Sequence, residues 1–522
     1  MSNLYETRVD QLLRSGQSDT LRGGLKGLEK ESLRISSDGE IAQTPHPVAW
    51  GAPLTHPYIT TDYSEALPEL ITPAFAELDQ TYGFLHDLHT FLYQNMGADE
   101  LLWAASMPCA VADDSRIPIA EYGSSNVGQM KHIYRVGLDY RYGRRMQAIA
   151  GVHFNYSLPP SFWPVYESFA DKKCSGQTFI DESYFDLIRN FKRLGWIVPF
   201  LFGNSPAVCK TFLAGRTTRF KAMSRGTYYL PYATSLRMSD IGYKNKNQSA
   251  LTVSYDALED YVRSLNQALV TPYPEYEAIG LTDGDKRVQL STNVLQIENE
   301  YYSFIRPKRT TEKMERPTTA LHQRGVEYVE VRALDVNCLS PTGVDIEQLR
   351  FIEAFLIYCL LSESPRLTSE ALSEIEYNEL TVALRGRTPG LDLIDSGQRR
   401  CIWRWATSIC EALKPIGHIL DDGDDDGPYS EAIIRQIEQI AAPDKLPAAY
   451  ILKTLQNQNV EYHNYVMSLS NRYAEDFRSG VQDASASEKF RHLAEQSLGE
   501  QRELEANDDE SLSDYIARYL AS

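Results

Sequence analysis

Acidic side chains in segments that alternate like strands are the clearest chemical signal in this 522-residue sequence. Glu29 and Glu31 are two residues apart, so a strand would present both on one face, about 7 Å from each other. Glu330 stands between two valines in another such segment. Three more acids lie close together between these segments: Asp62, Glu65 and Glu69. Carboxylate oxygens are the ligands that Mg²⁺ prefers, and this set is large enough for more than one octahedral ion.

A solvent-exposed face is the usual explanation of a Glu-x-Glu pair, but the apolar neighbours of these acids favour a place inside a sheet. Four segments alternate in this way, with polar side chains on one face: 27–34, 151–158, 294–302 and 328–334. In the second, His153 and Asn155 face away from Val152 and Phe154. The third aligns four polar side chains: Gln296, Glu298, Glu300 and Tyr302. The sequence therefore predicts a carboxylate-lined sheet.

Two arginines and one basic cluster could bind the oxygens of a carboxylate or a phosphate. Arg237 ends the run 228–237, and Arg332 stands two residues after Glu330. A guanidinium can hold such a group through two parallel hydrogen bonds, although a structural salt bridge is the competing explanation. Three basic residues form the cluster: Arg306, Lys308 and Arg309. They could hold a polyphosphate or lie on an exposed loop.

Several standard catalytic motifs are missing from the sequence. None of the 31 glycines is followed by lysine, and no Gly-x-Gly-x-x-Gly opens a helix, which excludes a Walker A loop and a Rossmann phosphate site. His-Glu-x-x-His and Gly-x-Ser-x-Gly are also missing, which argues against a zincin and an α/β-hydrolase. Oxygen-ligand chemistry remains.

Charge and composition restrict the partners. The chain has 52 Lys and Arg against 71 Asp and Glu, a net charge of −19 that disfavours nucleic acid and anionic lipid. The longest apolar stretch, 351–361, is far shorter than the roughly 20 residues that cross a bilayer. The seven cysteines include no Cys-x-x-Cys, which favours reduced thiols. We therefore expect a cytoplasmic protein without a nucleic-acid or membrane partner. We also expect a monomer.

The pattern of the chain changes near residue 345. Residues 1–345 mix strand-like and helical segments, whereas residues 346–522 predict helices joined by polar loops. Apolar residues recur at helical spacing in three stretches: 346–361, 431–442 and 447–469. We predict an α+β catalytic core at 1–345 with a helical region packed on it, or both in one integrated domain.

The aspartate-rich run at 421–428 has two interpretations. Asp422, Asp424 and Asp426 match the first half of an EF-hand loop, but the twelfth position, which should supply a bidentate Glu, is Ile433. A solvated loop is therefore the favoured interpretation.

Six stretches of the sequence resemble those of the proteobacterial type 1 glutamate–cysteine ligases. They occur in the same order along the chain: 27–34, 59–65, 151–155, 228–237, 295–300 and 305–309. The resemblance implies a mainly antiparallel sheet like that of glutamine synthetase, surrounded by helices. It also implies ATP-dependent joining of the γ-carboxylate of L-glutamate to the amine of L-cysteine, the first step of glutathione synthesis, with Mg²⁺ or alternatively Mn²⁺.

The resemblance also implies roles for individual residues. Five acids match metal ligands: Glu29, Glu31, Asp62, Glu69 and Glu330. Arg237 matches a glutamate-site arginine, and Arg332 one near the transferred phosphoryl group, so these two are the catalytic candidates. Four residues are assigned to the nucleotide: Arg306, Lys308, Arg309 and Arg332.

Aromatic and polar residues are assigned to the amino-acid substrates by the same resemblance. Three tyrosines match the cysteine pocket: Tyr134, Tyr243 and Tyr302. His153 and Gln147 match positions lining the same cleft. Tyr63 stands where the family pattern has phenylalanine, so we expect an extra hydroxyl near the cysteine pocket.

Two other functions remain open from the sequence. A carboxylate–amine ligase with a different acceptor amine would share the acidic sheet, and acceptor competition would distinguish it. A catalytically silent amino-acid or nucleotide sensor would bind ligand without turnover. Loss of the metal-binding acids would have favoured a sensor, but all of them are present.

Overall fold

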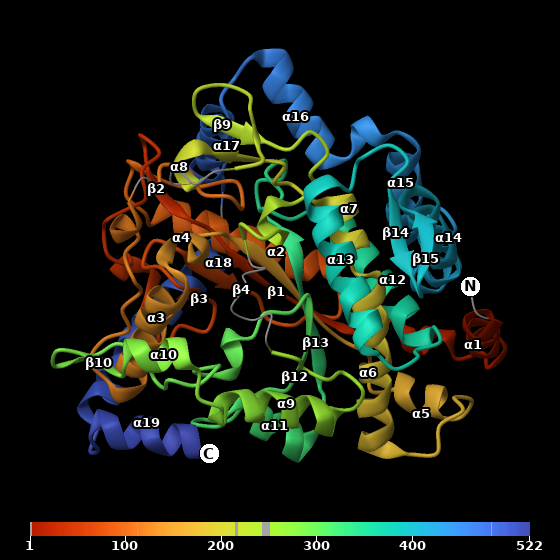
Figure 1. The fold of residues 1–522 in the computed structure, drawn as a ribbon, viewed down its shortest axis with the longest axis horizontal. Coiled ribbons are helices and arrows are strands. Elements are labelled where there is room, and N and C mark those ends of the chain that lie inside the picture. Colours follow the sequence, from red (N-terminus) through yellow and green to blue (C-terminus); the bar gives the residue numbers. More distant parts are fainter. Residues whose placement is uncertain (1–2, 112, 214–217, 243–250, 482) are drawn as a thin grey trace.

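A six-stranded sheet forms the centre of the fold in the computed structural model, which describes residues 3–111, 113–213, 218–242, 251–481 and 483–522 (Figure 1). The strand order is β12-β13-β6-β1-β4-β3, and each neighbouring pair is antiparallel. The strands, in sheet order, are β12 (Ile305–Lys308), β13 (Tyr328–Asp335), β6 (Gly151–Ser157), β1 (Leu25–Glu31), β4 (Pro68–Ile71) and β3 (Ile59–Thr61). This confirms the prediction of a mainly antiparallel sheet and of three of its strands.

The register of the sheet brings the predicted acids together. Glu29 is paired with His153, and Glu31 with Glu69. Glu330 is paired with Asn155 on β6. Side chains of directly opposed residues on antiparallel strands lie on one face, about 5 Å apart at Cβ. Acids 38 residues or more apart in sequence thus meet on one face of the sheet.

The remaining strands of the described residues are short and lie outside the central sheet. They form four small antiparallel sheets: β2 (Arg34–Ser36) with β5 (Glu100–Leu102), β7 (Ala207–Cys209) with β9 (Thr227–Tyr229) and β8 (Lys221–Ala222), β10 (Thr282–Asp283) with β11 (Lys286–Arg287), and β14 (Asp392–Asp395) with β15 (Gln398–Cys401).

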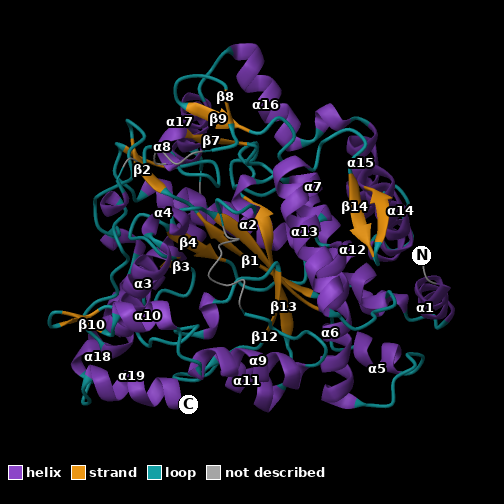
Figure 2. Ribbon diagram, in the orientation of Figure 1, coloured by secondary structure: helices purple, strands orange, loops and turns teal. Residues whose placement is uncertain are grey.

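Helices surround the central sheet, as Figure 2 shows. Those in the first two thirds of the chain are α1 (Asn3–Arg14), α2 (Leu78–Gln94), α3 (Asn126–Tyr142), α4 (Arg144–Gln147), α5 (Phe162–Glu167), α6 (Gly176–Leu194), α7 (Ile197–Phe202), α8 (Lys210–Leu213), α9 (Leu258–Val270), α10 (Pro274–Ile279) and α11 (Pro317–Arg324). Of these, α2, α6 and α7 contact strands of the central sheet directly. None of the helices in the described segments is long and apolar enough to cross a bilayer.

The last third is helical apart from the β14–β15 hairpin, which confirms that prediction. Its helices are α12 (Ile346–Leu361), α13 (Ser369–Arg385), α14 (Ile402–Leu420), α15 (Pro428–Ala441), α16 (Pro447–Gln458), α17 (Tyr462–Ser479), α18 (Ala484–Ala506) and α19 (Leu512–Ala521). The first has the bounds that the periodicity predicts. The stretch 447–469 is instead divided between α16 and α17, because Asn459 adopts a left-handed conformation that ends α16.

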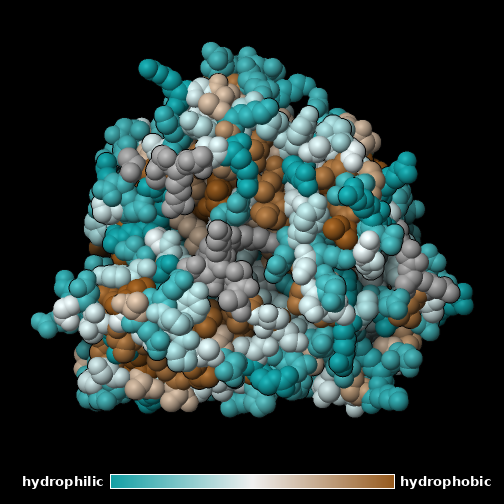
Figure 3. Space-filling view, in the orientation of Figure 1, coloured by the Kyte–Doolittle hydropathy of each residue, from teal (hydrophilic) through white to brown (hydrophobic). Residues whose placement is uncertain are grey.

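The C-terminal helices pack mainly against the helices around the sheet. Helix α12 contacts α2 and α6, and its Glu353 forms a buried ion pair with Lys26 of β1, with 2.8 Å between Oε1 and Nζ. Tyr429 of α15 donates a second hydrogen bond to Glu353. Helix α19 lies against α3, where Ile516 packs with Ile133. Apolar residues gather on the surface around α10 and α19, at the lower left of Figure 3. A separate domain boundary at residue 345 stays a prediction.

One predicted strand is wrong. Residues 294–302 do not pair in a sheet, and Glu298–Glu300 form a 3-10 turn. The backbone N–H of Gln296 donates to Glu300, whose carboxylate also accepts from Arg141 of α3. These contacts fold the segment back against α3, so its polar residues do not share one face.

The prediction of seven reduced thiols is also wrong for one pair. Cys109 and Cys209 form a disulfide with Cα atoms 5.3 Å apart. They lie 100 residues apart in sequence, so only the packing of the loop after β5 against β7 brings them together. The five other cysteines are free thiols, and Cys338, Cys359 and Cys410 among them are buried.

The aspartate run forms a capping loop. Both carboxylate oxygens of Asp421 accept backbone N–H groups at the start of α15, from Tyr429 and Ser430. Asp422 forms an ion pair with Arg22. These contacts give two acids of the loop structural roles, and the solvated-loop interpretation stays a prediction.

Candidate active site

A cavity of about 270 Å³ lies over the polar face of the central sheet. Strands β1, β4, β6, β12 and β13 form its floor, and helices α3 and α4 form one wall. Its lining contains nineteen residues: Glu29, Glu31, Asp62, Tyr63, Glu69, Tyr134, Arg135, Leu138, Tyr142, Met146, Gln147, His153, Asn299, Glu300, Tyr302, Arg306, Lys308, Glu330 and Arg332. All five predicted metal-binding acids are among them.

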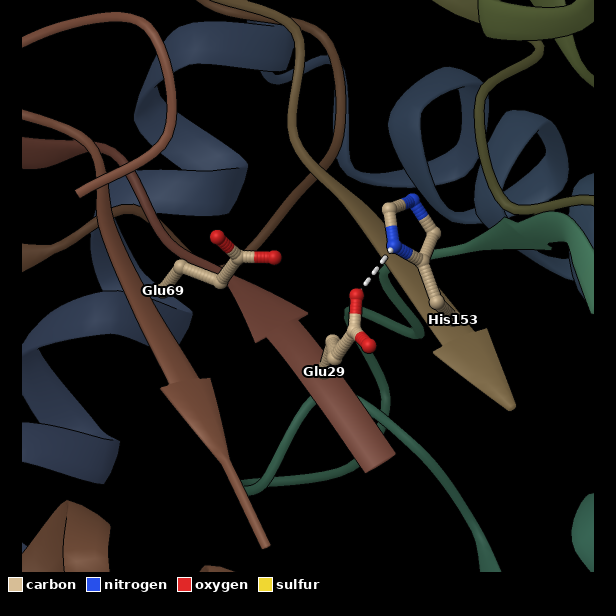
Figure 4. A group of neighbouring side chains, drawn as sticks. All are labelled: Glu29, Glu69 and His153. Atoms are coloured by element: carbon tan, nitrogen blue, oxygen red, sulfur yellow. Dashed lines mark hydrogen bonds and ion pairs between the residues drawn. The ribbon is translucent and has the colours of Figure 1, made fainter. Parts of the chain in front are cut away.

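Glu29, Glu69 and His153 form a compact group in this cavity (Figure 4). One ligand atom from each lies within 4.8 Å of the other two. His153 Nδ1 is 3.1 Å from Glu29 Oε2, and Asn155 donates to the other oxygen of Glu29 at 2.9 Å. Two carboxylates and an imidazole on three adjacent strands can therefore surround one divalent cation. The structure groups His153, which the resemblance assigned to the substrate cleft, with predicted metal ligands.

The charge balance differs across the cavity. Lys308 Nζ lies 3.3 Å from Glu330, and Arg332 lies 3.1 Å from it on the other side. Burial opposes ionisation of Glu330, but these cations outweigh it and hold the pKa of this carboxyl well below its usual range. Its carboxylate is therefore a fixed negative charge on the floor of the site.

At Glu31 and Glu69, in contrast, the nearby arginines do not outweigh burial and the neighbouring negative charges. Burial, followed by repulsion from Asp62, raises the pKa of Glu31 to about 8. Burial and the charge of Glu29 likewise raise the pKa of Glu69. A divalent cation at this point would favour the ionised carboxylates and so bind in exchange for protons.

Arg237 lies beneath the cavity and not in its lining. Its side chain is 1% exposed, and Nη2 donates to the carbonyl of Arg332 at 3.1 Å. A Cβ atom on Gly151 would lie 2.1 Å from Nη2, so a side chain at this start of β6 would displace the guanidinium. The N–H of Gly151 also donates to Glu31 at 2.6 Å. The guanidinium is thus held directly behind the acidic group.

Besides His153 and Arg237, five residues are predicted to bind the amino-acid substrates. Four of them line the cavity: Tyr63, Tyr134, Tyr302 and Gln147. The fifth, Tyr243, lies outside the described residues. Tyr63 is 2% exposed, and its hydroxyl has no hydrogen-bond partner among the described residues. This hydroxyl is therefore buried beside the site.

A second cavity, of about 320 Å³, adjoins the first. Arg306 and Lys308 line both cavities, whereas Arg309 lines only the second. Tyr261, Leu265 and other apolar groups complete its wall. The basic strand β12 therefore lies between an acidic site and a partly apolar one.

Sequence reasoning missed some of the lining and misplaced one acid. Arg135, Asn299 and Glu300 line the cavity, and their positions next to Tyr134 and within the motif 295–300 were the available signals. Glu65 instead accepts the backbone N–H groups of His46 and Glu121. It stabilises a loop and does not line the site.

The comparison with known protein families shows to which family this chain is related. The family model for glutamate–cysteine ligase matches residues 9–382. The chain belongs to the glutamate–cysteine ligase family. A glutamate–cysteine ligase from Alcanivorax borkumensis is 46% identical over 520 residues, covering 99% of both chains. Another from Pseudomonas aeruginosa is 44% identical over all of this chain and 99% of its own.

A solved structure supports the same relationship at the level of the fold. The glutamate–cysteine ligase of Francisella tularensis, in complex with AMP, superposes with a TM-score of 0.90. It is 35% identical, and the match covers 96% of this chain and 98% of that one. The family's characteristic sheet and the helical C-terminal region are thus both present here.

Proposed function

We propose that this protein joins the γ-carboxylate of L-glutamate to the amine of L-cysteine at the expense of ATP. The products are γ-L-glutamyl-L-cysteine, ADP and phosphate, and the reaction is the first step of glutathione synthesis. The observation that carries this proposal is the group of five acids and His153 that lines one cavity over the sheet, next to the basic strand β12. Membership of the glutamate–cysteine ligase family supports the same conclusion.

The acidic side of the cavity would hold Mg²⁺, or alternatively Mn²⁺. The donor set fits a hard divalent cation, because it consists of carboxylates with one imidazole. Bound there, the metal would offset the repulsion between the triphosphate and the γ-carboxylate. We assign Glu29, Glu69 and His153 to one metal-binding group, with Glu31, Asp62 and Glu330 beside it.

Arg332 and Lys308 would act on the phosphoryl group. A carboxylate is a poor acyl donor, so phosphorylation to γ-glutamyl phosphate must precede attack by the amine. Both cations already lie within 3.3 Å of Glu330, and a phosphoryl group entering this space would find two preorganised positive charges. Formation of the amide bond then releases phosphate.

The nucleotide would enter from the second cavity. Its apolar wall suits a base, and Arg306, Lys308 and Arg309 can pair with phosphate oxygens at the junction with the first cavity. The AMP bound by the Francisella tularensis relative supports a nucleotide substrate.

The amino acids would occupy the remaining part of the first cavity. We assign Arg237 to a carboxylate of L-glutamate, and Tyr63, Tyr134, Tyr302 and Tyr243 to the cysteine side. Gln147 would line the same cleft. Arg237→Lys should mainly raise the KM for glutamate, because a single ammonium cannot replace a planar fork of donors. An unchanged glutamate KM would contradict this assignment.

The cellular setting is part of the proposal. We place the enzyme in the cytoplasm, where its three small-molecule substrates are available, and we propose a monomer without a nucleic-acid or membrane partner.

A coupled assay of ADP release tests the reaction. Release should require glutamate, cysteine, ATP and Mg²⁺ together, and EDTA should abolish it. Activity that EDTA leaves unchanged would reject the proposal. Competition of cysteine with alanine, glycine and 2-aminobutyrate distinguishes a ligase with another acceptor. Saturable binding of glutamate or nucleotide without turnover would instead indicate a sensor.

A further inference from the structure

Arg387, just after the C-terminal end of α13, contacts the segment that leads to Arg237. Its Nε donates to the carbonyl of Ala233 at 3.1 Å, and its Nη2 donates to the carbonyl of Pro231 at 2.7 Å. Its backbone N–H donates to the carbonyl of Tyr232 at 3.1 Å. Three consecutive carbonyls of the run 228–237 are therefore bound by one residue from the helical C-terminal region.

The end of α13 holds the next two residues of the same segment. The carbonyl of Ala383 accepts the N–H groups of Thr234 and Ser235, at 3.0 and 3.3 Å. The Thr234 hydroxyl donates to the carbonyl of Val382 at 2.9 Å. Carbonyls in the last turn of a helix commonly lack a partner within the helix, so this turn supplies acceptors where the segment needs them.

The segment then passes directly into the turn that carries Arg237. Ser235 caps the 3-10 turn Leu236–Met238, and its hydroxyl donates to Asp335 of β13 at 2.7 Å. Asp335 Oδ1 lies 4.0 Å from Arg237 Nη1. The position of this guanidinium thus depends on Asp335 from the sheet and on the end of α13 from the other side.

The Arg387 guanidinium is used for backbone contacts rather than for an ion pair. Its two side-chain hydrogen bonds in the described part of the chain both end on backbone carbonyls. Burial is the main cause that lowers its pKa, to about 10, while the charge of Asp444 acts to raise this pKa. Placing a charged group in this environment is unfavourable unless its donors are satisfied, and both satisfied donors end on the segment before Arg237.

We propose that Arg387 is a positioning residue for the glutamate site: by fixing carbonyls 231–233, it sets the place of Arg237 beneath the cavity. This inference rests on the proposed assignment of Arg237 to L-glutamate. It gives the C-terminal region an indirect part in substrate binding, through Arg237, although none of its described residues lines the main cavity.

Kinetics of Arg387→Met and Arg387→Lys in the full chain test this proposal. Arg387→Met should raise the glutamate KM about tenfold and leave the KM values for ATP and cysteine within about twofold. Arg387→Lys should recover part of the effect, since an ammonium can still donate to one carbonyl. Arg385→Met is the matched control. The Arg385 side chain is exposed and donates a hydrogen bond to Tyr377, so its loss should leave all three KM values unchanged.

Two results would overturn the proposal: an unchanged glutamate KM in Arg387→Met, or equal increases in all three KM values with a lower Tm. If Arg387→Met does not fold, the same criteria apply to Arg387→Lys. Calorimetric titration with L-glutamate in the presence of Mg²⁺ and ADP gives a second readout, in which the Kd should rise as the KM does. Wild-type protein that neither turns over nor binds glutamate would refute the proposed function itself.

Discussion

Replacing Glu31 with glutamine is expected to stabilise the metal-free protein and to weaken its response to Mg²⁺. Burial and the charge of Asp62 raise the pKa of Glu31 from 4.5 to about 8 in the folded state. At a pH between these two values, the Glu31 carboxyl has lost its proton in the unfolded chain but keeps it in the folded chain. The folded state therefore loses stability as the pH rises from 4.5 to 8.

The size of this effect follows from the same two pKa values. At pH 7 the unfolded carboxyl is roughly 2.5 units above its pKa, and about 1.4 kcal/mol per unit gives a cost of about 3 kcal/mol. Glutamine has no proton to lose, and its side-chain oxygen can still accept the N–H of Gly151. An unfolding entropy of about 2 cal/mol/K per residue converts this gain into a Tm increase of about 3 °C at pH 7 and less than about 1 °C at pH 5.

Calorimetric unfolding of both proteins from pH 5 to 8.5, in EDTA and in Mg²⁺, measures these values. Mg²⁺ should raise the Tm of the wild type more than that of Glu31→Gln. Glu65→Gln is the matched control, because Glu65 is another acid that the sequence offers as a candidate metal ligand but that does not line the cavity, and its Mg²⁺ response should equal that of the wild type. A lower Tm for metal-free Glu31→Gln at pH 7, or equal Mg²⁺ responses in both proteins, would refute the reasoning.

Three other substitutions test the site and its support. Glu29→Gln should lower kcat by about 100-fold or more through the loss of a metal ligand, as measured by ADP release. Gly151→Ala should raise the glutamate KM at least about tenfold, because the new Cβ would lie 2.1 Å from Arg237 Nη2. Lys26→Met should lower the free energy of unfolding by about 3–5 kcal/mol in urea titrations, since it leaves the Glu353 charge buried, and adding Glu353→Gln should recover most of this loss.

Controls and contradicting outcomes are specific to each of these changes. Gly83→Ala in α2 meets no atom within 4 Å and should leave the kinetics unchanged while stabilising the helix by up to about 1 kcal/mol. A Glu29→Gln enzyme with near wild-type kcat would remove Glu29 from the metal site. A Gly151→Ala enzyme that loses kcat at constant glutamate KM would indicate a different defect, and a Lys26→Met protein as stable as the double variant would argue against a buried charge.

The sequence by itself determined the features that depend on neighbouring residues. The two-residue period of a strand put Glu29 and Glu31 on one face, and the helical period gave 346–361 its observed bounds. The motif order identified the family and the acidic residues of the site. These features need no knowledge of distant contacts, because side-chain direction in a strand or helix is a property of the local backbone.

The tertiary structure alone decided which distant groups meet. The pairing of Glu31 with Glu69 and of Glu29 with His153 depends on sheet register, which the loops and packing fix. The same packing turned 294–302 away from the sheet, joined Cys109 to Cys209, and brought Arg387 to the carbonyls before Arg237. Each of these contacts links residues far apart in the chain, and its free energy arises only when the whole core has closed around it.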